Sequence, residues 1–97
     1  MNIGVCRVEI RLPESQSLKD KRRITKSLIA RLQNEYRISV AEVENHELWQ
    51  LASIGIACVS NHARHADEVL TNALNFIVHN YPQVEIVSHE TEIIPVF

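Results

Sequence analysis

A cationic run near position 20 is the part of this sequence best suited to chemistry with a partner. Residues 19–26 are Lys-Asp-Lys-Arg-Arg-Ile-Thr-Lys. Positions three, four and seven apart are neighbours on a helix, so four cations form one row: Lys19, Arg22, Arg23 and Lys26. Phosphates repeat along RNA, so this row predicts salt-dependent binding to structured RNA or a ribosomal particle. The alternative is a solvated helix face, although most such faces mix charge signs.

Other cations and carboxylates offer weaker candidates. Lys21 lies off the row, and we expect its stem to be partly buried. Arg7 and Arg11 belong to a strand, and whether they add to a binding surface is left open. Glu42 and Glu44 would share one face of a strand, as an acid–base pair does, but no nucleophile accompanies them. The alternative for these two is an edge strand kept soluble by its charge.

The sequence predicts no enzyme, metal or cofactor. His62 and His65 stand three apart on a predicted helix, but a metal site needs three or four converging ligands. With only two glycines in the chain, phosphate-binding glycine loops are excluded. No catalytic residues are therefore assigned.

Length, charge and cysteine usage narrow the class of protein. The chain has 97 residues, a formal net charge of -2 and 45% apolar residues, which are values of one globular domain spanning residues 1–97. Nine of its 10 basic residues fall in residues 1–37, while eight of its 12 acidic residues fall in residues 38–97. No apolar run approaches the roughly 20 residues of a membrane span. Cys6 and Cys58 are expected to be buried free thiols, and the predicted location is the cytoplasm.

Hydrophobic periodicity predicts six elements. Alternation of Cys6, Val8 and Ile10 with charged neighbours indicates a strand over residues 2–12. Ser17 is expected to cap a helix from Leu18 to Tyr36, with Asp20 completing a capping box. Ser60 or Asn61 is expected to cap the second helix. The remaining elements are a strand over 38–44, a turn over 45–47, a strand over 48–60, a helix over 62–80 and a strand over 84–94.

The element order is thus β-α-β-β-α-β. This order predicts an α+β ferredoxin-like fold, a sandwich with both helices on one face of an antiparallel sheet of strand order 4-1-3-2. Trp49 is expected to pack at one end of the core rather than to anchor an interface, which is the alternative.

The other face of the predicted sheet is too apolar to stay bare. It carries six apolar residues: Ile3, Val5, Ala41, Val43, Ala57 and Val59. Contiguous apolar patches usually mark interaction surfaces, so we expect a homodimer or a docked partner there. The alternative is that small residues and long neighbouring side chains shield this face.

Several segments together resemble a known family. They are Gly-Val-Cys-Arg-Val-Glu at 4–9, Ser-Leu-Lys-Asp-Lys-Arg-Arg at 17–23, Ser-Val-Ala-Glu-Val at 39–43, Leu-Trp-Gln at 48–50 and Ile-Gly-Ile-Ala-Cys-Val-Ser-Asn at 54–61. Across nearly the whole chain, the sequence resembles the YlxP-like family of small bacterial proteins, a domain of unknown function. The resemblance implies a ferredoxin-like domain in the bacterial cytoplasm. Members are often encoded beside translation and ribosome-maturation genes, notably ribosome-binding factor A. No catalytic residues are implied.

These observations lead to two hypotheses of function. The first is a non-enzymatic binding module that associates with structured RNA or a ribonucleoprotein through the basic helix. The second is a dimeric scaffold or regulatory domain that binds a protein or a small ligand at the open sheet face.

Overall fold

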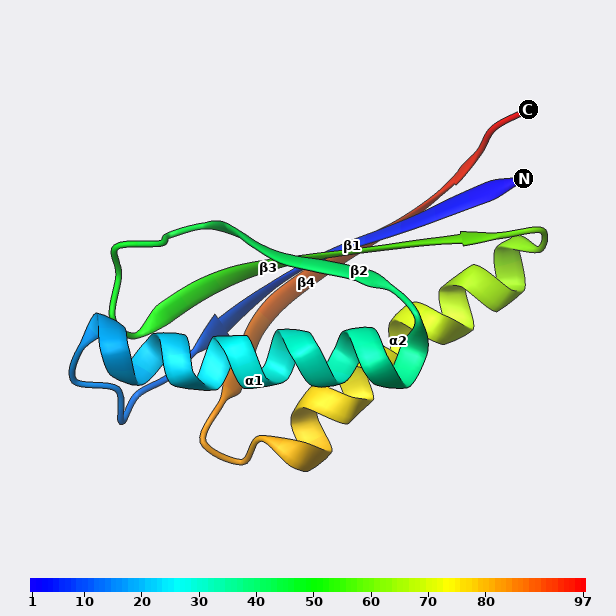
Figure 1. Cartoon of the computed structure of the whole chain (residues 1–97). Coiled ribbons are helices and arrows are strands. Elements are labelled where there is room, and N and C mark those ends of the chain that lie inside the picture. The colour runs from blue at the N-terminus through cyan, green and yellow to red at the C-terminus, as the bar shows by residue number, and fades with distance from the viewer.

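Four strands and two helices account for most of the chain. The computed structural model describes all residues 1–97. The elements, labelled in Figure 1, are β1 (Asn2–Arg11), α1 (Leu18–Tyr36), β2 (Ser39–Glu44), β3 (Leu51–Ser60), α2 (Ala63–Asn80) and β4 (Glu85–Pro95).

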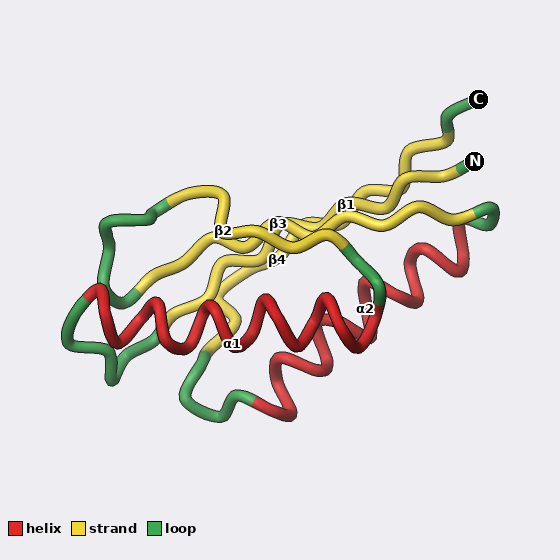
Figure 2. The backbone as a smooth tube through the Cα atoms, viewed as in Figure 1, coloured by secondary structure: helices red, strands yellow, loops and turns green.

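The strands form one antiparallel sheet of order β2-β3-β1-β4. Both helices lie on the same side of this sheet (Figure 2). The predicted ferredoxin-like α+β fold and its strand order 4-1-3-2 are therefore confirmed.

Local hydrogen bonds explain where α1 begins and ends. The Ser17 hydroxyl accepts a bond from the amide of Asp20 at 3.0 Å, which confirms the predicted cap. The Asp20 carboxylate accepts from the amide of Gln16, the residue before the cap, at 3.0 Å and not from that of Ser17, so the predicted capping box is not formed. Arg37 ends the helix in a left-handed conformation, with φ of 51°.

The sequence placed the starts of two elements wrongly. The cap of α2 is His62, without a side-chain bond, because the Ser60 hydroxyl accepts from the amide of His62 ahead of the helix. β3 begins at Leu51 rather than at residue 48, because a turn joins the Leu48 amide to the Asn45 carbonyl.

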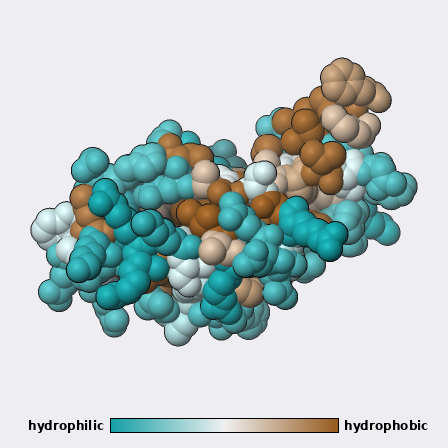
Figure 3. All heavy atoms as spheres, viewed as in Figure 1, coloured by the Kyte–Doolittle hydropathy of each residue, from teal (hydrophilic) through white to brown (hydrophobic).

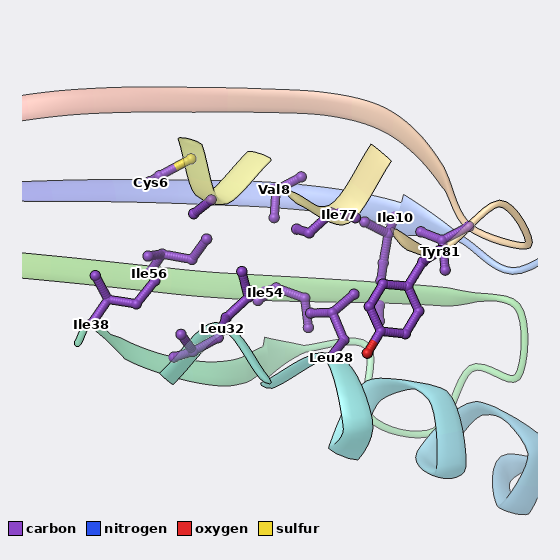
Figure 4. Packing of buried hydrophobic residues seen from close by; sticks show 14 of the residues in the cluster. Cys6, Val8, Ile10, Leu28, Leu32, Ile38, Ile54, Ile56, Ile77 and Tyr81 are labelled. Atoms are coloured by element: carbon purple, nitrogen blue, oxygen red, sulfur yellow. The ribbon is translucent and has the colours of Figure 1, made fainter. Parts of the chain in front are cut away.

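The core lies between the sheet and the helices. One cluster of buried apolar side chains joins both layers (Figure 4): Cys6, Val8, Ile10, Leu28, Leu32, Ile54, Ile56 and Ile77 are among its members. Trp49 does not belong to it. The residue is 55% exposed, so the prediction that it packs in the core is wrong, since the loop before β3 carries it outward.

The molecule is elongated, measuring 45 × 22 × 20 Å. At one end the strands extend past α1 and carry the two chain termini, which lie side by side (Figure 1). There the Val96 carbonyl accepts from the amino group of Met1 at 2.8 Å.

Candidate functional site

The cationic row occupies the outer side of α1. The residues of α1 that are buried against the rest of the fold are Lys21, Thr25, Leu28 and Leu32. At about 100° per residue, Lys19, Arg22, Arg23 and Lys26 lie on the opposite side of the helix. All four are exposed. Their one ion pair within 4.0 Å joins Arg23 to Asp20 at 3.7 Å, so three of the four cations have no carboxylate partner.

Other arginines in the N-terminal part of the chain are engaged within the fold. Arg7 binds Glu9 and Glu44, each at 2.8 Å. Arg11 binds Glu85 at 2.6 Å. Both guanidiniums are thus bound to carboxylates of the same chain, while about half of each side chain stays exposed and Arg7 also lines the groove described below.

Arg31 of α1 is engaged in a different way. Its guanidinium carbon lies 4.9 Å from the centre of the Phe76 ring and 5.4 Å from that of Tyr81. These cation–π contacts join α1 to the end of α2 and hold Arg31 apart from the cationic row.

Lys21 is buried more deeply than its sequence position predicts. Its side chain is fully buried, rather than partly. The ammonium donates to the Glu42 carboxylate at 2.9 Å and to the carbonyls of Asn45, His46 and Leu51 at 2.8, 3.3 and 3.1 Å. Lys21 therefore fastens the loop between β2 and β3 to the first turns of α1.

Glu42 and Glu44 do not form a pair. A bulge shifts the register of β2 against β3 between these two residues. As a result Glu42 points to α1 and binds Lys21, whereas Glu44 points to the other side of the sheet and binds Arg7. The predicted shared face is therefore wrong.

The hydrogen bonds of Glu9 perturb its titration. Its carboxylate accepts from the Ser53 hydroxyl and from Arg7. The bond from Ser53 and, to a smaller extent, that from Arg7 lower the pKa of Glu9, although partial desolvation opposes them. The bonds to Glu9 and Glu44 raise the pKa of Arg7. Cys6 and Cys58 are both free, and burial raises the pKa of each thiol, although Cys58 is only partly buried and not fully buried as expected.

A groove runs across the sheet face that the helices leave open. Four of the six residues predicted for that face line it, namely Val5, Ala41, Val43 and Ala57. The groove has a volume of about 640 Å³, and Gly55 lies among its lining residues. Glu90 and Glu92 of β4 also line it. These two carboxylates were not predicted as site residues, although their alternation in β4 was a usable signal.

The other two predicted residues, Ile3 and Val59, lie beyond the groove. They are direct cross-strand partners, and Ile94 of β4 pairs with Ile3 on the other side. Val59 is 68% exposed. Apolar side chains gather over this protruding end of the sheet in Figure 3.

The histidines form no cluster. His62 and His65 are both exposed, at the start of α2. Nowhere do three or more His, Cys, Asp or Glu side chains gather in a way that could hold a metal ion. Neither helix is long and apolar enough to span a bilayer.

Comparison with known proteins identifies the family of this chain. The model of a family described as "Protein of unknown function (DUF503)" matches residues 3–91. The "Uncharacterized protein YlxP" of Bacillus subtilis (strain 168) is 33% identical over 90 residues, which cover 93% of this chain and 97% of the relative. The chain therefore belongs to the DUF503 family, a YlxP-like family of unknown function.

Proposed function

We propose that this protein is a non-enzymatic, cytoplasmic binding module that associates with structured RNA or a ribosomal particle through the outer side of α1. The observation that carries the proposal is the row of Lys19, Arg22 and Lys26, which have no carboxylate within 4.0 Å. Elsewhere Arg7 and Arg11 are paired with carboxylates and Lys21 is buried, whereas the remaining exposed cations, Arg31, Arg37 and Arg64, stand singly outside the row. Unpaired cations in a row suit a partner with repeating negative charge.

The chemistry favours the RNA backbone over its bases. α1 presents ammonium and guanidinium groups, but no aromatic ring stands within the row 19–26. Single-stranded RNA is usually recognised by stacking on aromatic side chains. Double-stranded RNA is recognised by shape and by phosphate and 2′-hydroxyl contacts, which suits a cationic helix.

Salt titration of binding to a ribosomal RNA hairpin tests this proposal. Replacing Arg22 and Lys26 by alanine should weaken binding and reduce the salt slope by about one unit for each phosphate that is no longer neutralised. Arg64→Ala is the matched control, since Arg64 is an exposed cation on α2 outside the row. Equal losses of affinity in the row variants and the control would contradict the proposal.

The protruding end of the sheet supports a second candidate, a dimeric scaffold. Ile3, Val59 and Ile94 form an uncharged stripe across three strands, and Val59 is the most exposed of them. Such a stripe suits burial against the same stripe of a second copy.

Sedimentation equilibrium tests this second candidate. Val59→Glu should shift a dimer to a monomer, because burial of a carboxylate in an apolar interface is costly. Val78→Glu is the control, since Val78 is an exposed valine on α2. A wild-type monomer at about 1 mM would refute it.

A further inference from the structure

The groove on the open sheet face has small side chains in its floor. Val5, Gly55 and Ala57 come from the two central strands, β1 and β3, and Arg7 of β1, which reaches Glu44 of β2, lies beside them. A Cβ atom at Gly55 would lie only 2.9 Å from a methyl group of Val43. Glycine therefore lets the Val43 side chain lie close to the sheet while the floor stays low.

The dimensions of the groove suit an α-helix. Its sides come from β2 and β4, the outer strands, which are separated by three inter-strand spacings of about 4.8 Å, or about 14 Å. An α-helix with its side chains is about 10 Å across. A low floor of small residues allows such a helix to approach the sheet, and a volume of 640 Å³ leaves room for its apolar stripe.

The charged side chains that line the groove indicate which kind of partner it can bind. Glu90 and Glu92 on the β4 side have no cation within 4.0 Å. Arg7, the only cation that lines the groove, stands directly across from Glu90 in the β1–β4 pairing, but it is bound to Glu9 and Glu44 instead. The groove is thus apolar at its floor and negative at its rim.

A second copy of the chain fits this groove poorly. Symmetric pairing presents the same surface from both subunits, so the excess of carboxylates would meet an equal excess. Like charges that face one another across an interface oppose association. A cationic partner has no such penalty.

We propose that the groove binds an amphipathic helix of a cationic protein partner, with its apolar stripe on Val5 and Ala57 and its Lys or Arg side chains toward Glu90 and Glu92. This interaction goes beyond the RNA contact proposed for α1. It uses the opposite side of the molecule, because α1 covers the other face of the sheet (Figure 1).

A designed peptide tests the proposal on the intact protein. The probe is a helical peptide of about 18 residues, with leucine at helical spacing and lysine at the flanking positions. A second peptide carries glutamate in place of lysine. We expect the lysine peptide to bind and to shift the amide NMR signals of Gly55 and Ala57, with affinity that falls as salt rises.

Two variants locate the interaction. Glu90→Lys/Glu92→Lys should weaken binding of the lysine peptide at least about tenfold and favour the glutamate peptide. Ala57→Leu places a larger side chain in the floor of the groove. It should lower the affinity for the lysine peptide and reduce the NMR shifts, compared with the wild type. The control, Asp67→Lys/Glu68→Lys, makes the same charge change at exposed positions of α2 and should leave binding unchanged. Circular dichroism checks that each variant is folded.

Three results would overturn the proposal. The first is absence of binding at about 1 mM peptide. The second is equal binding of the lysine peptide to the wild type, the β4 variant and the α2 control. The third is a wild-type dimer that Ala57→Leu dissociates, since the groove would then be occupied by a second copy. None of these results depends on RNA binding by α1, so the two proposals stand or fall separately.

Discussion

Replacing Lys21 by methionine removes the single cation that holds the loop between β2 and β3. Methionine has nearly the length of lysine and leaves the helix intact, so packing changes little. What changes is electrostatic. The Glu42 carboxylate, only 15% exposed, loses its one ion pair, and three backbone carbonyls lose a donor.

The expected loss of stability can be estimated from the Glu42 carboxylate, which Lys21→Met leaves unpaired. Removing one partner of a buried ion pair costs about 3–5 kcal/mol, because the remaining charge stays desolvated. We expect a value near the lower end, about 3 kcal/mol, since Glu42 keeps some contact with water and the 45–50 loop is mostly exposed. A domain of this size is stable by about 5–15 kcal/mol, so the loss is a large fraction of the total.

Urea denaturation measures this loss. With an m value of about 1–1.5 kcal/mol/M, the midpoint should fall by about 2–3 M. Lys19→Met is the matched control, since it makes the same change outside the core two residues away and should cost less than about 0.5 kcal/mol. Glu42→Gln combined with Lys21→Met should recover part of the loss, because no buried charge is then left unpaired.

Two outcomes would refute the reasoning about Lys21. If Lys21→Met costs as little as Lys19→Met, the ammonium does not hold the loop. If the double variant recovers nothing, the cost lies in the loop carbonyls and not in the charge of Glu42.

Other predictions follow from single contacts. Gly55→Ala should destabilise the fold by about 1 kcal/mol in thermal unfolding, because the new methyl group meets Val43. In a Val43→Ala background the same Gly55→Ala change should stabilise the fold, since glycine is intrinsically unfavourable in a strand. Because hydrogen bonds lower the pKa of folded Glu9, its stabilising contribution should be complete above its ordinary value near 4.5 and be lost as pH falls through the lower folded value. Unfolding of Glu9→Gln should accordingly depend less on pH in that range, and an unchanged dependence would contradict the assignment. Iodoacetamide should modify Cys58 before Cys6, because Cys6 is shielded more completely. Both cysteines should react more slowly in the folded protein than in urea, because burial raises the pKa of each thiol. Mass spectrometry can follow both reactions.

The fold could be predicted because its signals are local and redundant. The alternation around Val8 and the cap at Ser17 each specify one element independently of tertiary contacts. The prediction failed where an apolar loop residue adjoins a strand and looks like part of it. Trp49 continues the apolar character of β3, but the turn that closes on Asn45 takes it out of the sheet.

The candidate surfaces were only partly predictable, for a physical reason. The row on α1 follows from helical spacing alone, and its four residues lie outside the core as expected. The role of Lys21 does not follow, because it depends on carbonyls from 24 to 30 residues further along the chain. The bulge that separates Glu42 from Glu44 has no sequence signal that strand periodicity detects.

In the folded protein, the uneven charge of the chain gives a positive surface on α1 and a negative one on the open face of the sheet. The strand cations Arg7 and Arg11 are neutralised in place, so what remains of the N-terminal positive charge is concentrated on the outer side of α1. The acidic C-terminal part contributes Glu90 and Glu92 to the other face of the sheet. A polyanion would therefore attract the helix side and repel the groove, which leaves the groove directed away from it. On this geometry the two proposed partners do not compete for one surface, and removal of either interaction by mutation should leave the other measurable.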